Sequence, residues 1–250
     1  AEGDHSLSMG VRSSASGLNS LAIGYDNTAS GTQSVAVGNG TNASGNFSVA
    51  MGLGAEAGTK NDDVESTENG AAVAVGFGAS AANTGSAAYG YYANAGAINA
   101  SAFGTSASTT VEGGVALGAH SVANRDKGST GYLAPDMTNP ANAADATTWV
   151  STSGAVSLGG ADPTVDESEN KKKITRQITN LAAGSADSDA VNVAQLKAFA
   201  SQGMNFQGND TNTSVHLDQG GTLQIQGSGR KDDTEYSPQN VKVLTDTANK

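Results

Sequence analysis

The residues best suited to acid–base or metal chemistry are three histidines and two clusters of carboxylates. His5, His120 and His216 are far apart in the sequence, and none belongs to a triad or metal-ligand motif. The chain contains no cysteine, which excludes disulfides and thiol catalysis. We therefore expect no enzyme activity, no catalytic residue, no metal site and no cofactor.

The two carboxylate clusters fit solvated loops better than cation sites. Asp62, Asp63, Glu65 and Glu68 lack the alternating ligands and the glycine of a calcium-binding loop. The second cluster, residues 162–169, runs directly into three lysines, and such a charge run is usually a solvated connector. The net charge of −11 also disfavours a nucleic-acid partner or an anionic membrane surface.

A five-residue phrase, typified by Ser-Val-Ala-Val-Gly at 34–38, organises the chain and occurs nine times with variations. Most copies are 14 residues apart, with longer gaps only between Gly52 and Gly76 and between Gly118 and Gly159. A fixed period with insertions at certain places predicts a stack of equal coils. Fourteen residues suit two short strands and two tight turns. We expect glycines such as Gly24 and Gly31 to supply positive φ at the two turns.

The columns of the repeat predict which side chains face inward. In a strand, the second and fourth positions share one face, and the third position points the opposite way. The third position is always Ala or Ser, so it should line a narrow roll interior. The residues assigned there are Ala22, Ala36, Ala50, Ala74, Ala88, Ala102 and Ala116.

The bulky second and fourth positions form a long apolar stripe, which two-stranded coils cannot cover within one chain. A stripe of this size would far exceed the apolar patch of an ordinary soluble monomer. We therefore expect a homo-oligomer whose stripes meet at its centre. The residues assigned to this core are Leu7, Met9, Leu21, Ile23, Val35, Val37, Val49, Met51, Val73, Val75, Tyr89, Phe103, Val115, Leu117, Val156 and Leu158.

Two kinds of alternative were weighed against this solenoid. Gly- and Ser-rich repeats can be disordered linkers, but the regular columns argue against disorder. Hexapeptide acyltransferases, calcium-binding nonapeptide repeats and ice-binding solenoids each have a signature that this sequence lacks.

The segment after the last repeat predicts a strand, a helix and a small sheet. We expect a strand at 174–181 and a helix at about 190–201 that begins after Asp187-Ser188-Asp189. A hairpin should pair 214–217 with 222–226, and 241–244 should add a third strand. The apolar residues assigned to the helical neck region are Ile174, Ile178, Leu181, Val193, Leu196 and Ala200.

The second insertion carries its own apolar residues, Tyr132, Met137 and Trp149. Either they pin this segment to the roll, which we favour for Trp149, or they contribute to specificity, as loops on a rigid scaffold often do.

Taken together, these motifs resemble trimeric autotransporter adhesins of the YadA type. The 14-residue units resemble the head, and Ile-Thr-Arg-Gln-Ile-Thr-Asn-Leu-Ala-Ala-Gly from Ile174 resembles the neck. Ala123–Lys127 and Trp149–Thr152 are similar to the ends of the head insert motif. The resemblance implies an all-β fold, a left-handed parallel β-roll that forms a homotrimer, followed by a short helical neck with a coiled coil and a small β connector. The implied domains are a head at 1–118 with an insertion near 59–69, a head insert at 119–153, a last head coil at 154–161, a neck at 162–203 and a truncated stalk connector at 204–250.

The resemblance also implies a function at the bacterial cell surface. The family's heads are exposed virulence factors of the outer membrane that bind collagen, fibronectin or laminin, or other copies of themselves on neighbouring cells. Membrane contact would come only through an anchor outside this sequence. The alternative is a structural spacer of a surface fibre with no ligand site. The residues that contact a ligand are not identified by the sequence.

Overall fold

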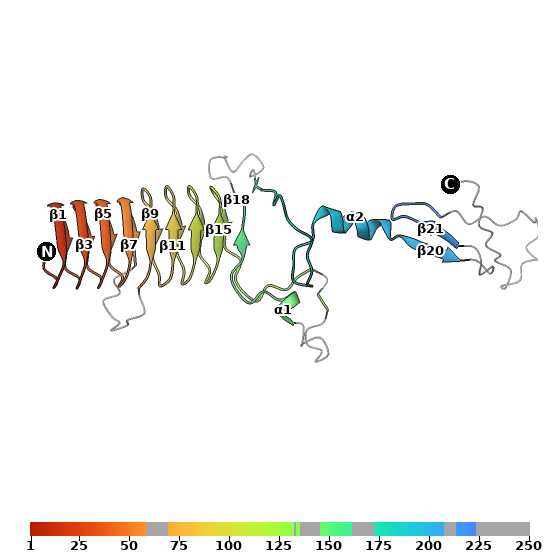
Figure 1. Ribbon diagram of the computed structural model, residues 1–250, viewed down its shortest axis with the longest axis horizontal. Coiled ribbons are helices and arrows are strands. Elements are labelled where there is room, and N and C mark those ends of the chain that lie inside the picture. The colour runs from red at the N-terminus through yellow and green to blue at the C-terminus, as the bar shows by residue number, and fades with distance from the viewer. Residues whose placement is uncertain (59–69, 133, 136–145, 162–172, 208–213, 224–250) are drawn as a thin grey trace, which may run out of the picture. The chain divides into compact units, whose positions relative to one another are not determined.

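Every copy of the five-residue phrase forms a strand, and these strands stack in parallel in the computed structural model (Figure 1). The structure describes residues 1–58, 70–132, 134–135, 146–161, 173–207 and 214–223. It divides into two compact units, Ala1–Gln177 and Ile178–Lys250, which are described separately. The predicted solenoid of 14-residue coils is confirmed by a nine-stranded parallel sheet in the first unit. Its strands, in order, are β1 (Leu7–Val11), β3 (Leu21–Tyr25), β5 (Val35–Asn39), β7 (Val49–Leu53), β9 (Val73–Val75), β11 (Ala87–Tyr89), β13 (Ser101–Phe103), β15 (Val115–Leu117) and β17 (Val156–Ser157).

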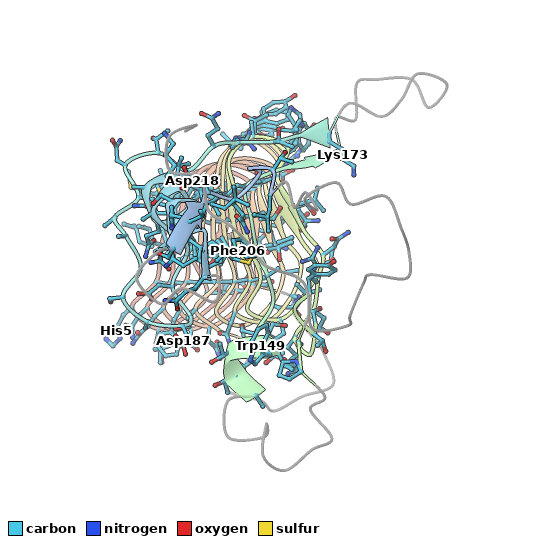
Figure 2. All side chains as sticks on the ribbon, turned by 90° about the vertical axis from the view of Figure 1, so that its right-hand side faces the viewer. His5, Trp149, Lys173, Asp187, Phe206 and Asp218 are labelled. Atoms are coloured by element: carbon cyan, nitrogen blue, oxygen red, sulfur yellow. The ribbon has the colours of Figure 1, made fainter. Side chains whose placement is uncertain are left out.

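The other half of each coil forms a second parallel sheet of eight very short strands. These are β2 (Ser14–Ala15), β4 (Thr28–Ala29), β6 (Asn42–Ala43), β8 (Glu56–Ala57), β10 (Ser80–Ala81), β12 (Asn94–Ala95), β14 (Ser108–Thr109) and β16 (Val122–Ala123). Viewed end-on, successive coils lie one behind another (Figure 2).

The two insertions leave the register of the stack unchanged. Val49 pairs with Val73 across the first insertion, and Val115 pairs with Val156 across the second. Each insertion is therefore an excursion from a coil rather than a break in the solenoid. The acidic cluster at 62–68, Met137 and the charge run at 162–172 lie outside the described residues.

The apolar core between the two sheets consists of alanine, and the other buried side chains among the described residues of the roll are serine, threonine and one asparagine. The seven alanines assigned to the roll interior all have no exposed surface. Alanines of the second sheet, such as Ala29 and Ala43, are equally buried and face the same interior. Because close packing leaves no room for longer chains, the column accepts only Ala and Ser.

Enlarging one interior alanine should therefore destabilise the roll. We expect Ala36→Leu to lower the free energy of unfolding by about 1–3 kcal/mol, since Ala36 lies between Ala22 and Ala50 in a filled interior. Thermal unfolding would measure the effect. Thr28→Leu is the matched control, because Thr28 is exposed on the second sheet. Equal loss of stability in both variants would contradict the inward position of Ala36.

The expected role of the half-coil glycines was wrong in one respect. Gly31 does not have a positive φ, and the left-handed conformation in that turn belongs to Gln33, with a φ of 57°. Gly31 is needed instead for space, because a Cβ there would lie 2.0 Å from the carbonyl oxygen of Gly45 in the next coil. The glycines that close the first eight phrases do behave as expected, and Gly24, for example, has a φ of 125°. Gly159, which closes the ninth phrase, does not have a positive φ.

The expected strand at 174–181 was too long. The short antiparallel pair β18 (Gly160–Ala161) and β19 (Lys173–Ile174) contains its first residue, and residues 175–181 form no strand. A strand needs a neighbour for its backbone hydrogen bonds, and the described part of the chain offers one only to Lys173 and Ile174. The insert contributes a short helix, α1 (Ala146–Trp149), on which Trp149 is labelled in Figure 2.

In the second unit, the helix starts later than expected and uses a different cap. α2 (Val193–Ser201) is capped by Asn192, whose side-chain oxygen accepts a hydrogen bond from the backbone N–H of Gln195. The side-chain oxygen of Gln195 in turn accepts the backbone N–H of Asn192. This capping box satisfies two backbone donors at once. Asp189 instead closes a turn, accepting backbone N–H groups of Ser185 and Ala186 at 2.8 and 3.0 Å, and these bonds lower the pKa of its carboxyl group.

The predicted hairpin has a different partner strand. β21 (Ser214–Leu217) pairs antiparallel with β20 (Met204–Gln207), whereas Thr222 and Leu223 form no strand. β20 follows directly after Gly203 and was not predicted from the sequence, which favoured residues 222–226 as the partner strand. The third strand expected at 241–244 lies outside the described residues.

Candidate functional site

The outward face of the nine-stranded sheet carries the apolar stripe. Register pairs place like positions side by side, so that Met9, Ile23, Val37 and Met51 form one continuous row. The residues assigned to the oligomer core lie on this face, where Val37 is half-buried and Met9 keeps 53% of its surface exposed. Within one chain nothing in the described residues covers this row, which leaves an apolar surface typical of an interface.

Two coils carry aromatic rings in this stripe. Tyr89 and Phe103 stack with ring centroids 5.3 Å apart and planes 7° from parallel. The neighbouring second positions are Ala87 and Ser101, which are small. The volume of the stripe is therefore kept roughly even along the stack, which favours a packed rather than a solvated surface.

The opposite sheet presents a polar ladder to solvent. Its outward residues are Ser14, Thr28, Asn42, Glu56, Ser80, Asn94, Ser108 and Val122, each in register with the next. All but the last are hydroxyl, amide or carboxylate side chains. A flat row of hydrogen-bonding groups at a fixed spacing can contact an extended polar partner at several coils at once.

A buried polar staple joins two coils near the start of the stack. Asn27 is fully buried, and its amide donates to the carbonyl oxygens of Ile23 and Gly38 at 2.6 and 2.9 Å. Its side-chain oxygen accepts the backbone N–H and the hydroxyl of Thr41 at 2.9 and 2.7 Å. Every hydrogen-bonding site that this amide needs is filled, so it rigidifies the scaffold that carries both surfaces.

The insert contacts the roll through a salt bridge and is closed on itself by a backbone hydrogen bond. Lys127 forms a salt bridge of 3.0 Å with Glu112, and this contact raises the pKa of the Lys127 ammonium group. The backbone N–H of Gly131 donates to the carbonyl oxygen of Trp149 at 2.7 Å. Tyr132 is 89% exposed and so pins nothing in the described part of the chain.

An arginine that sequence reasoning missed covers the end of the stack. The Arg176 guanidinium donates to the carbonyl oxygens of Leu158 and Ala119, the latter at 2.7 Å, and to the Ser121 hydroxyl at 3.1 Å. These carbonyl groups lie at the last coil, where no further coil is available to pair with them in the described residues. In the sequence, Arg176 lies three residues after a run of lysines, and nothing in that position indicates this role.

The apolar residues assigned to the neck are mostly exposed within one chain. Ile178, Leu181, Val193 and Leu196 are exposed, whereas Ile174 and Ala200 are half-buried. Val191 and Phe199 are also exposed and were not singled out from the sequence. In the second unit this leaves an amphipathic helix without a partner, as expected of one strand of a coiled coil.

Within the described residues, the groups that could do chemistry are dispersed. No cluster of three or more His, Asp or Glu residues that could hold a metal ion occurs among the described residues. His216 contacts Asn205 at 2.8 Å and Asp218 at 3.2 Å within its own hairpin. None of the helices in the described ranges is long and apolar enough to cross a membrane.

Comparison with known protein families identifies the repeats and the neck. Residues 1–27, 29–55 and 95–121 match the YadA head domain repeat, and residues 177–216 match the coiled stalk of trimeric autotransporter adhesins. The stalk match covers the helix and both strands of the second unit.

Three curated relatives are autotransporter adhesins. The autotransporter adhesin BadA of Bartonella henselae is 38% identical over 138 residues, which are 53% of this chain. The trimeric autotransporter adhesin AtaA of Acinetobacter sp. (strain Tol 5) is 39% identical over 44% of the chain, and EhaG of Escherichia coli O157:H7 is 38% identical over 40%. The matched regions span only 4%, 3% and 5% of these relatives.

Among solved structures, the collagen-binding domain of the Yersinia adhesin YadA aligns with a TM-score of 0.43 and 27% identity. The alignment covers 76% of this chain and 85% of that domain.

Proposed function

We propose, from the head repeats and the coiled-stalk segment of trimeric autotransporter adhesins of which this chain is built, that it is the binding head of a bacterial surface adhesin. The observation that carries the proposal is the combination of both segments in one chain, with three adhesin relatives at 38–39% identity. The head would lie at the outer face of the cell, and we retain the expectation that it has no enzyme activity and no cofactor.

The assembly that we propose is a homotrimer. The apolar stripe of the nine-stranded sheet would face the same stripe on two other copies, and the exposed apolar residues of α2 would form the core of a three-stranded coiled coil. Burial of apolar area is the main driving force for such association. The division of the chain into head, insert, last coil, neck and stalk connector is proposed on the same grounds.

The ligands that we propose are extracellular-matrix proteins, such as collagen, fibronectin or laminin, or other copies of the head on neighbouring cells. The polar ladder of the second sheet supports this choice, because it repeats the same kind of contact on every coil. Three copies of such a ladder would convert weak individual contacts into firm attachment.

A structural spacer is the second candidate. It is favoured by the match of residues 177–216 to the coiled stalk, which in this second proposal would act as a spacer without a ligand site of its own. The two functions differ in whether this piece of the protein binds anything.

Both readings can be tested on the purified 250-residue chain. Light scattering should give about three times the mass of 24.7 kDa. The chain should then bind to surfaces coated with collagen, fibronectin or laminin but not with albumin, and beads coated with it should be tested for self-aggregation. A trimer that binds none of these proteins and leaves its beads dispersed would favour the spacer, and a monomer would overturn the assembly.

A further inference from the structure

Three aromatic rings cluster at the turns that follow strands β9 and β11 of the nine-stranded sheet. Phe77 and Tyr91 come directly after the closing glycines of neighbouring coils, and their rings stack with centroids 5.2 Å apart and planes 15° from parallel. Tyr92 stands at 82° and 83° to these rings, 5.2 Å from Phe77 and 4.6 Å from Tyr91. We name this cluster of Phe77, Tyr91 and Tyr92 the aromatic corner.

The corner is held in place by the backbone around it. The ring of Tyr92 occupies the position that a side chain on Gly78 would take, since a Cβ there would lie 2.6 Å from two of its ring carbons. Tyr92 itself has a φ of 50°, a left-handed conformation that is costly for a bulky residue. The missing side chain of Gly78 and the strained backbone of Tyr92 together orient this ring toward the other two.

Within one chain the corner is exposed to solvent, and the described residues of the coils around it carry few charges. Tyr91 and Tyr92 are 52% and 51% exposed, and neither hydroxyl has a hydrogen-bond partner among the described residues. Within residues 13–58 and 70–111, the charged side chains are Asp26 and Glu56 alone. Among the described residues, no carboxylate lies in the two coils that carry these rings to attract a cationic ligand.

We propose that the aromatic corner binds a neutral saccharide. The apolar C–H face of a hexopyranose ring would pack against one exposed tyrosine ring, and its edge would meet the perpendicular one. The free hydroxyl groups of Tyr91 and Tyr92 would exchange hydrogen bonds with the hydroxyls of the sugar. A neutral ligand is chosen because nothing at the corner could pair with an ionised group.

This inference goes beyond attachment to matrix proteins and does not depend on it. Phe77 and Tyr91 follow Gly76 and Gly90 just past the ends of β9 and β11, whose Val75 and Tyr89 belong to the stripe proposed for assembly, so the corner borders that stripe. A second copy of the chain could cover the corner instead of a ligand, and the experiment below tests for this outcome.

The experiment is saturation-transfer NMR on the full 250-residue chain, with lactose and cellobiose as neutral probes and choline as a cationic one. We expect transfer to a neutral saccharide and about a tenfold weaker affinity in Tyr91→Ala and in Tyr92→Ala, which is the size of a lost stacking contact. Tyr91→Phe should keep most of the affinity because it keeps the ring.

Tyr25→Ala is the matched control. Tyr25 also follows a closing glycine, but its ring contacts only the Arg12 guanidinium, 5.0 Å from the ring centroid, and belongs to no aromatic cluster in the described residues. It should leave saccharide affinity unchanged. A second arm would compare an asialoglycoprotein with vesicles containing lactosylceramide, and preferential binding to either over its sugar-free carrier would support the proposal and identify the source.

Four results would overturn it: no transfer to either saccharide in the unmodified chain, equal affinity in Tyr91→Ala, binding of choline in place of the sugars, or loss of the oligomer in Tyr91→Ala. The last result would place the corner between copies. Binding of the same variants to coated matrix proteins separates the two proposals, because a variant that loses the saccharide but keeps matrix binding leaves the proposed function intact.

Discussion

Replacing Gly38 by alanine is expected to lower the free energy of unfolding of the head by about 3 kcal/mol or more. Gly38 closes the third phrase with a φ of 148°, a backbone conformation that residues with a Cβ rarely adopt. A Cβ at this position would also lie 2.4 Å from the carbonyl oxygen of Gly52 in the next coil. That oxygen belongs to the backbone of the stack, so the clash can be relieved only by separating two coils.

Gly40→Ala provides the matched control for this prediction. Gly40 lies in the same turn and also has a positive φ, of 62°, but a Cβ there would meet nothing within 4 Å. It should cost only about 1 kcal/mol, the ordinary price of a left-handed alanine. Chemical denaturation followed by circular dichroism, at one protomer concentration, would measure both variants. If the two variants lost equal stability, the close approach of the next coil would not be the reason that position 38 requires glycine.

The stack of coils was predictable because one column of the repeat carries a strict size limit. Ala36 and its equivalents alternate with larger neighbours, and this alternation fixes both the strand and its facing. The 14-residue period then fixes the register, so that even coils separated by an insertion pair as expected. Local pattern and global fold agree here at every coil, which is why the sequence was sufficient to predict the stack of coils and its register.

The features that were missed depend on contacts between coils rather than on pattern within one coil. Asn27 looks like an ordinary turn residue, and only the structure shows that its amide is buried and bonded to the next coil. Gln33 adopts the left-handed conformation although a glycine lies two residues before it. Arg176 reaches the carbonyl group of Ala119, 57 residues earlier in the chain, a separation that no local signal encodes.

The helix of the second unit shows how competing signals mislead. Asp187 and Asp189 are good helix-capping residues, but the carboxylate of Asp189 is already bonded to the turn at Ser185 and Ala186. Asn192 and Gln195 have the spacing of a capping box and so begin the helix. Gln195 also bonds the backbone of Gly184, which fixes the preceding loop against the helix start.

Replacing Val37 by aspartate is expected to prevent assembly of the proposed trimer. Val37 lies between Ile23 and Met51 in the apolar row on the outward face of the nine-stranded sheet. In a trimer joined through this face, three carboxylates would be brought together in an apolar core without partners. Each buried unpaired charge costs several kcal/mol, and the three would also repel one another. Light scattering should therefore show a monomer in place of a trimer.

Thr28→Asp is the control that separates the effect of the face on which the residue lies from the effect of the added charge. It adds the same carboxylate at an exposed position of the second sheet, next to Ser14 and Asn42, and should leave the mass and melting temperature unchanged. An intact trimer of unchanged melting temperature with Val37→Asp would show that the stripe is not the contact between copies. Because Val37 and Ala36 are adjacent and face opposite ways, the two substitutions separate the surfaces: Ala36→Leu should disturb the roll of each chain, and Val37→Asp only its association.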